Sequence, residues 1–272
     1  MKFSVLIPIY AGEKAENFEE CIESIINQTK KPNEILIIKD GPLTESLERT
    51  IENKIEENKE IEIRTHQIEK NVGVGIASNI GTKLCKYNYI ARIDSDDISV
   101  KDRFEKQINY LKENPDVDIL GGYIEEYDEN MEKLISIRKV PLEDTEIKTD
   151  MKSRCAFNHS TVIYKKDRII EAGNYSNRRI MEDYDLWIRC TKKGYKMHNL
   201  PIVLTKNRTG NAMYYKRGGI NYAQIIIEIQ EQLYSLKMIN IFRKWYNIFI
   251  RTLVALMPLN MRRFVYINLL RK

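Results

Sequence analysis

The sequence predicts an α/β fold in which a mostly parallel sheet is flanked by helices and followed by a helical C-terminal extension. Three observations predict it. Apolar strand-like runs alternate with amphipathic helical segments through the first half, and parallel strands need such helical crossovers. Polar residues follow several of these runs directly, at the positions where open parallel sheets bind ligands. From residue 222 onward the pattern is purely helical.

The first half alternates strands and helices in a regular order. Residues 3–10 are almost entirely apolar and predict a buried strand, and apolar residues at helical spacing follow at 18–26. The other elements predicted in this half are strand 34–39, which ends at the turn Asp40-Gly41-Pro42, helix 43–58, strand 61–65, helix 71–85, strand 89–94 and helix 103–113.

The second half is more mixed. Its predicted elements are strands 118–127, 134–140, 161–164 and 203–208, and a helix at 182–193 that ends before Gly194. We place the end of the main domain at residue 219, divide that domain into the halves 1–97 and 98–219, and assign 220–272 to the helical extension.

Composition and charge exclude several classes of protein. A length of 272 residues is enough for one large or two small domains, and a net charge of +5 does not by itself indicate a nucleic-acid partner. The four cysteines include no C-x-x-C pair, which predicts buried thiols in a reducing compartment. No apolar signal segment or bilayer-length apolar stretch is present, so we expect a cytosolic protein.

Three aspartates within four positions, Asp94, Asp96 and Asp97, follow the predicted strand 89–94. Carboxylates this close repel one another unless a cation lies between them, and burying them is costly. In an extended segment, alternation would turn Asp94 and Asp96 to the same side. Two oxygen donors there suit a hard divalent cation such as Mn²⁺ or Mg²⁺. The alternative is a turn that contains an aspartate helix cap, which is the role we favour for Asp97.

Other polar residues end neighbouring strands. Tyr10, Asp40 and Asp94 each stand at the carboxyl end of a predicted strand. In a parallel sheet these ends meet along one edge, so the three side chains are expected to contact a common ligand.

Taken together and in order, these segments resemble the family 2 glycosyltransferases of the GT-A fold, whose sheet is Rossmann-like. The matching segments are residues 4–10, 24–29, 32–35, 40–41, 71–73, 77–81, 91–97, 103–107, 158–162 and 182–187. Lys216-Arg217-Gly218-Gly219 and the C-terminal tail resemble bacterial enzymes that extend O-antigen, capsule or exopolysaccharide units on a polyprenyl diphosphate, several of which are β-1,3-galactosyltransferases.

The resemblance implies a UDP-sugar donor and a Mn²⁺ or Mg²⁺ cofactor, with residues 1–97 as the nucleotide-binding half. Nucleotide contacts are implied for Pro8, for Tyr10 and Asp40 at the uracil, and for Asn71 and Gly73 in the loop over the nucleotide. Asp94 is implied at the ribose or metal, and Asp96 at the metal. Simpler roles stay open, because Asp40 can build a turn and Gly73 can be a helix-start glycine.

By the same resemblance, residues 98–219 form the acceptor half and Asp183 is the general base. Adjacent carboxylates at a helix start allow one to cap the helix and the other to face the cleft, and they push one pKa upward. Asp185 is the alternative base, and Glu182 is a further candidate substrate contact. His159 is a candidate contact to the diphosphate, metal or sugars, and Arg217 is a candidate contact to a phosphate of the donor or of the acceptor lipid.

The implied reaction is inverting transfer of a hexose, with galactose as one candidate, to a polyprenyl-diphosphate-linked sugar. Two alternatives stay open: a sugar nucleotidyltransferase and a non-catalytic nucleotide- or glycan-binding module. A nucleotidyltransferase normally begins with a Gly-rich phosphate loop, and the first loop here, residues 11–14, lacks one.

The tail combines an apolar stripe with basic residues. Residues 240–272 contain seven basic and no acidic residues, and the stripe on the helix at 241–256 includes Phe242, Trp245 and Phe249. With Arg243, Lys244 and Arg251 off the stripe, this pattern predicts an interfacial helix on the anionic inner face of a bacterial plasma membrane. The alternative is a helix packed on the catalytic domain or on a partner subunit.

Overall fold

The computed structural model describes residues 1–209 and 217–268, with side chains described as far as residue 265. Lys216 and residues 269–272, which contribute to the sequence predictions, lie outside the described residues. In chain order the elements are β1 Phe3–Ile9, α1 Ala15–Ile26, β2 Glu34–Asp40, α2 Glu45–Glu57, β3 Glu62–Ile68, α3 Val74–Leu84, β4 Tyr89–Arg92, β5 Ile98–Ser99, α4 Arg103–Glu113, β6 Ile119–Tyr127, β7 Leu134–Arg138, α5 Asp144–Asp150, the 3-10 turn η1 His159–Thr161, β8 Ile163–Lys165, α6 Lys166–Glu171, α7 Glu182–Lys192, β9 Met197–Arg208, α9 Gly219–Ser235, α10 Ile241–Leu256 and α11 Leu259–Asn268.

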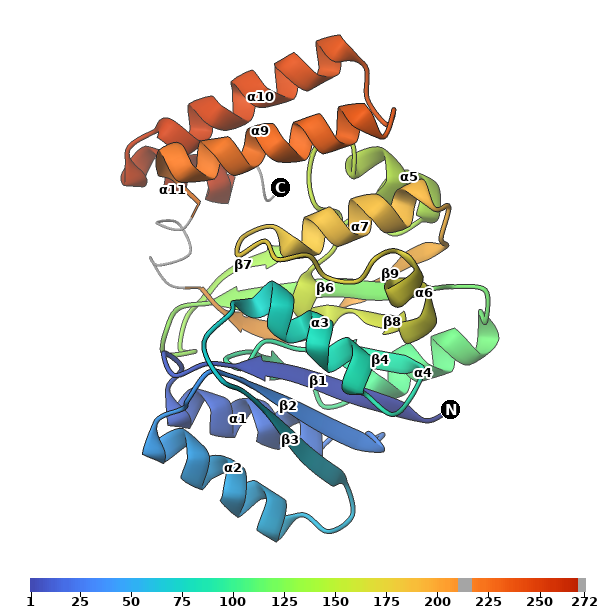
Figure 1. Ribbon diagram of the computed structural model, residues 1–272, viewed down its shortest axis with the longest axis vertical. Coiled ribbons are helices and arrows are strands. Elements are labelled where there is room, and N and C mark those ends of the chain that lie inside the picture. The colour runs from blue at the N-terminus through green and yellow to red at the C-terminus, as the bar shows by residue number, and fades with distance from the viewer. Residues whose placement is uncertain (210–216, 269–272) are drawn as a thin grey trace.

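One sheet of nine strands runs through the protein in the order β3-β2-β1-β4-β8-β6-β9-β5, with β7 beside β6 (Figure 1). The strands β3, β2, β1 and β4 are mutually parallel. Beyond β4 the sheet is mixed, because β8 is antiparallel to both β4 and β6. The prediction of an α/β fold is confirmed: the N-terminal strands are all parallel, and in the mixed part β6 and β9 are parallel as well.

Helices cover both faces of the sheet (Figure 1). Alternation along β1 sends Val5 and Ile7 into one core with α1, α2 and α4, and sends Leu6 into a second core with α3, α5, α6, α7 and α9. The buried face of α9, including Ile229 and Leu233, belongs to this second core. The predicted helical extension therefore packs on the main domain through α9.

Three parts of the fold differ from the prediction. The helices α5 and α6 have seven and six residues, too short to show a helical period, and neither was predicted. The strand β9 begins at Met197 rather than at residue 203. Pro201 lies where the register between β6 and β9 shifts, at a bulge where the N–H that proline lacks is not needed. Because a proline inside a run argues against a strand, the sequence did not predict the first part of β9.

The helix α10 lies over α9 with its polar side turned inward. Asn247 Nδ2 donates to the Lys152 carbonyl at 3.0 Å, Arg251 Nη1 donates to the Ser153 carbonyl at 2.6 Å, and Lys244 pairs with Glu231 of α9. The apolar stripe is left on the outside: the exposed fraction is 83% for Phe242, 60% for Trp245 and 66% for Phe249, although Ile248 is buried. The expectation that Lys244 and Arg251 flank the stripe on an outer basic face is wrong, because both serve internal contacts.

Candidate active site

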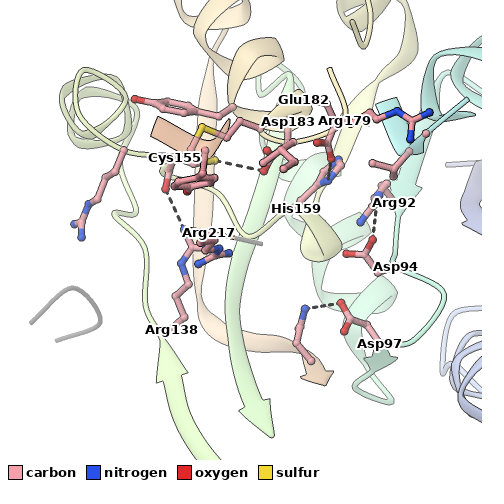
Figure 2. A pocket seen from close by; sticks show the side chains of 18 of the residues that line it. Arg92, Asp94, Asp97, Arg138, Cys155, His159, Arg179, Glu182, Asp183 and Arg217 are labelled. Atoms are coloured by element: carbon pink, nitrogen blue, oxygen red, sulfur yellow. Dashed lines mark hydrogen bonds and ion pairs between the residues drawn. The ribbon is translucent and has the colours of Figure 1, made fainter. Parts of the chain in front are cut away.

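A cleft of about 1190 Å³ opens at the carboxyl ends of β1, β2 and β4 and extends past the start of α7 to α10 (Figure 2). It brings together most of the residues predicted for the site. Those that line it are Pro8, Tyr10, Asp40, Asn71, Gly73, Asp94, Asp96, His159, Glu182, Asp183 and Arg217.

At one end, the Asp40 carboxylate organises the loop before α3. It accepts hydrogen bonds from the backbone N–H groups of Val72 (2.7 Å) and Gly73 (2.9 Å) and from the Asn71 side chain (3.0 Å). Gly73 caps α3 with φ of +93°, a conformation that L side chains rarely adopt. The Asp40–Asn71–Gly73 cradle is therefore rigid, and it leaves Tyr10, 46% exposed, at the open rim of the cleft.

The segment Asp94–Asp97 forms a turn rather than the extended continuation of β4 that was predicted. The strand ends at Arg92, and the Asp97 N–H donates to the Asp94 carbonyl at 3.3 Å. Asp97 is buried and accepts a hydrogen bond from Asn207, whereas α4 is preceded by Asp102. The prediction that Asp97 caps the next helix is thus wrong, because its carboxylate ties the acidic turn to β9.

Asp96 carries the unbalanced charge of this turn. Burial, then Asp94 and Glu13, raise the pKa of the Asp96 carboxyl to about 7. Asp94 pairs at 2.6 Å with Arg92. Within the described part of the chain no ion pair neutralises Asp96, so a cation placed there would relieve its repulsion from Asp94 and Glu13.

The acidic turn fits a divalent cation that arrives with a phosphorylated substrate. Among the described residues, no group of three or more His, Cys, Asp or Glu side chains is arranged to hold a metal ion. Two carboxylates, Asp94 and Asp96, are what a Mg²⁺-like ion takes from a protein when substrate phosphates and water complete its coordination. The donor chemistry therefore matches the predicted cofactor.

A second acidic group lies at the start of α7. Met181 precedes this helix with φ of +62°, a left-handed conformation that costs about 1–3 kcal/mol in a non-glycine residue. It places Glu182 and Asp183 in the first helical turn, at the cleft wall. The positive end of the helix dipole stabilises negative charge there.

Glu182 and Asp183 occupy different environments. Burial, then the charge of Asp183, raises the pKa of Glu182 to about 8, so Glu182 is largely protonated at neutral pH. The Cys155 thiol contacts Asp183 Oδ2 at 3.7 Å. The sequence predicted that one of the two pKa values would rise, and in the structure it is that of Glu182.

His159 lies between these two acidic groups and is neutral. Burial, then Arg92, holds the pKa of His159 well below its ordinary value. Its Nε2 is 2.8 Å from the Tyr175 hydroxyl, and its Nδ1 is 3.8 Å from Glu182 Oε1. Neutral His159 and protonated Glu182 thus form an uncharged, hydrogen-bonding patch in the cleft wall.

Asp185 is not brought to the cleft. Its carboxylate is buried and pairs with Arg189 at 2.7 Å and with Arg178 at 3.7 Å, and it does not line the pocket. This placement gives no support to the expectation that Asp185 is an alternative base or a substrate contact. Asp183 and Asp185 are two residues apart in the first turn of α7, about 200° around the helix axis, so their side chains point to different sides of the helix.

Among the residues of the cleft lining that sequence reasoning missed are Arg92, Arg138 and Cys155. Arg92 is 1% exposed, and its Nε and Nη1 groups have no hydrogen-bond partner among the residues that the structure describes. A signal for Arg92 was present, because an arginine inside an apolar strand directly before an acidic turn needs a partner. Arg138 and Cys155 carried no such signal.

The comparisons with known proteins agree with this geometry. A family model described as "Glycosyl transferase family 2" matches residues 4–172. The amylovoran biosynthesis glycosyltransferase AmsE of Erwinia amylovora is 38% identical over 97% of each chain. An Escherichia coli protein, UDP-Gal:alpha-D-GlcNAc-diphosphoundecaprenol beta-1,3-galactosyltransferase, is 34% identical over 100% of this chain and 97% of that protein.

Solved structures with the same fold are more distant in sequence. Residues 1–349 of TarS from S. aureus align with a TM-score of 0.64 and 17% identity, over 94% of this chain and 71% of that chain. The mannosyltransferase PcManGT from Pyrobaculum calidifontis, in complex with GDP-Man and Mn²⁺, aligns with a TM-score of 0.64 and 14% identity, over 86% of this chain and 64% of that chain.

Proposed function

The chain belongs to glycosyl transferase family 2 and is a glycosyltransferase with the predicted GT-A fold, and from this premise we propose that it transfers a hexose from a UDP-sugar to a polyprenyl-diphosphate-linked sugar. The transfer inverts the anomeric configuration and serves bacterial surface polysaccharide synthesis. Galactose is the first candidate donor hexose, and a relative whose name specifies UDP-Gal and a GlcNAc-diphospholipid supports it.

One observation carries this proposal: a single cleft contains a nucleotide-sized cradle, an acidic turn and a separate carboxylate. The Asp40–Asn71–Gly73 cradle, with Pro8 and Tyr10, accepts the uridine. Asp96 and Asp94 hold the divalent cation, which, when bound, neutralises charge on the departing diphosphate. The donor hexose then lies against His159 and Glu182, between the two acidic groups.

Asp183 is the general base. Its carboxylate takes the proton from the acceptor hydroxyl as that oxygen bonds to the anomeric carbon, and the bond from that carbon to the UDP oxygen breaks. One displacement inverts the configuration, so an α-linked donor gives a β-linked product. Protonated Glu182 donates a hydrogen bond to a sugar hydroxyl, and this leaves Asp183 as the proton acceptor.

A donor screen tests the proposal. Each UDP-sugar, with GDP-mannose as a comparison, is incubated with Mn²⁺ and a GlcNAc–diphosphate carrying a short alkyl chain, and nucleotide release is measured. We expect UDP release with one hexose donor and a β-linked product by NMR. Release of diphosphate from UTP and a sugar 1-phosphate would instead identify a nucleotidyltransferase, and no turnover with any donor would contradict the proposal.

We further propose that α10 attaches the enzyme to the cytoplasmic face of the membrane through its outer apolar stripe. Phe242, Trp245 and Phe249 are exposed together, and Arg243 beside them is exposed as well. No described helix has the length and apolar character to cross a bilayer. Co-sedimentation with anionic vesicles tests this attachment: W245S/F249S should stay in the supernatant, and equal sedimentation of variant and wild type would contradict it.

A further inference from the structure

The end of the cleft nearest α10 carries an excess of positive charge. Its lining includes Arg138, Arg154, Arg217, Arg243 and Arg251, against the acids Asp150 and Asp183. Asp150 is already paired with Arg154 at 2.7 Å. Arg138 and Arg217 lie near Asp183, across from Asp94 (Figure 2), where the acceptor must lie if Asp183 is the base.

Arg138 and Arg217 lie side by side in this wall (Figure 2). Arg138 Nη2 donates to the Cys155 carbonyl at 3.1 Å, which fixes the guanidinium next to the residue that touches Asp183. An arginine has five N–H donors, so this bond leaves most of them available to a ligand. Burial lowers the pKa of Arg138, and the charge of Arg217 lowers it further, so an anion between the two guanidiniums would be stabilised.

Arg251 extends the basic wall to α10. Its Nη1 donates to the Ser153 carbonyl at 2.6 Å, and Asn247, one turn earlier, holds the helix to the Lys152 carbonyl. Ile250 and Val254, on the same helix, also line the cleft, while Phe249 and Leu253 are exposed outside it. The helix thus joins a basic pocket wall to an apolar surface.

We propose that Arg138, Arg217 and Arg251 bind the diphosphate of the lipid-linked acceptor, and that its lipid leaves the cleft along α10. This inference rests on the proposed function, because it assigns the acceptor subsite of the same cleft. Two bridging guanidiniums suit the two phosphates, and the diphosphate then holds the first acceptor sugar beside Asp183.

Acceptor truncation combined with arginine substitution tests the assignment. Three acceptors carry GlcNAc on the same short alkyl chain through a diphosphate, a monophosphate or an ether, and kcat and KM are measured with each. For R138Q we expect KM to rise about 10- to 100-fold on the diphosphate acceptor, the loss typical of charge-assisted hydrogen bonds, and to change little on the ether. R251Q should show the same pattern with a smaller effect.

Controls separate this role from a general defect. R168Q removes an arginine of α6 that is half-exposed and outside the cleft, and it should match wild type on all three acceptors. UDP binding by calorimetry reports that R138Q and R138K are folded. Two outcomes would overturn the assignment while leaving the proposed function standing. In the first, R138Q and R138K lose activity equally on all three acceptors. In the second, the wild type shows the same kcat and KM with all three. No transfer by wild type to any acceptor would overturn both.

Discussion

The acidic turn after β4 and the acidic start of α7 use the same side chains in opposite ways. The turn packs Asp94 and Asp96 together with one nearby guanidinium, that of Arg92, and leaves the pKa of Asp96 raised to about 7. The start of α7 stands on a helix dipole and resolves its repulsion by protonating Glu182, whose pKa rises to about 8. A cation or a proton can relieve the repulsion at Asp96, whereas at Glu182 a proton relieves it.

The way in which the repulsion between carboxylates is relieved indicates which chemistry each cluster can support. A pair of carboxylates that accepts a cation can hold a substrate diphosphate through it. A pair that shares a proton keeps one carboxylate ionised as a base and the other neutral as a hydrogen-bond donor. The roles proposed for Asp96 and Asp183 rest on how the repulsion in each cluster is relieved, and substitutions can test the two clusters separately.

The largest expected effect is at Asp96. D96N removes a metal ligand with little change in shape, and turnover should fall about 1000-fold, as expected when several kcal/mol of transition-state stabilisation are lost. Chelation of divalent cations should have a comparable effect on wild type. The melting temperature should stay level or rise, because a buried repulsion is removed. E105Q, at an exposed acid of α4, is the matched control. Retention of most activity by D96N would remove Asp96 from the metal site.

The next effect is at Asp183. D183N should lower kcat about 100-fold, the scale of general base catalysis, with UDP affinity unchanged by calorimetry. D185N, two residues along α7, should do the reverse: it breaks the pairs with Arg178 and Arg189 and lowers the melting temperature, while kcat stays near the wild-type value. If D185N lowered kcat and D183N did not, Asp185 would replace Asp183 as the candidate base.

The smallest effect is a pH dependence of stability that belongs to Glu182. Its pKa rises from an ordinary 4.5 to about 8 in the folded protein, so between these values only the unfolded chain ionises. Glu182 therefore costs the wild type stability as pH rises through this window, by a few kcal/mol at most. E182Q cannot ionise, so it should match wild type near the low end of the window and exceed it at the high end in urea unfolding. Parallel stability profiles would show that Glu182 is ionised in the fold.

Much of the fold and part of the site could be predicted from the sequence, for identifiable physical reasons. Hydrophobic periodicity predicts long elements such as β1 and α1, in which buried residues recur at regular spacing. It cannot predict α6, because six residues are too few to show a helical period. Asp40 is the last residue of β2 and Asp94 lies two residues beyond β4, and both were predicted as candidate contacts from their place at strand ends. The placement of Arg138 beside Asp183 could not be predicted, because β7, the segment around Cys155 and α7 meet only in the folded chain.

The antiparallel pairing of β8 with β4 has a consequence for dividing the chain. Ala91 of β4 is in register with Ile163, so the parallel strands at the N-terminus are completed by a segment some seventy residues later. A fragment that ends at residue 97 would present a bare, apolar strand edge to other copies of itself. We expect such a fragment to aggregate on expression, and the amount recovered in the soluble fraction measures this. Co-expression with the remainder of the chain should restore its solubility.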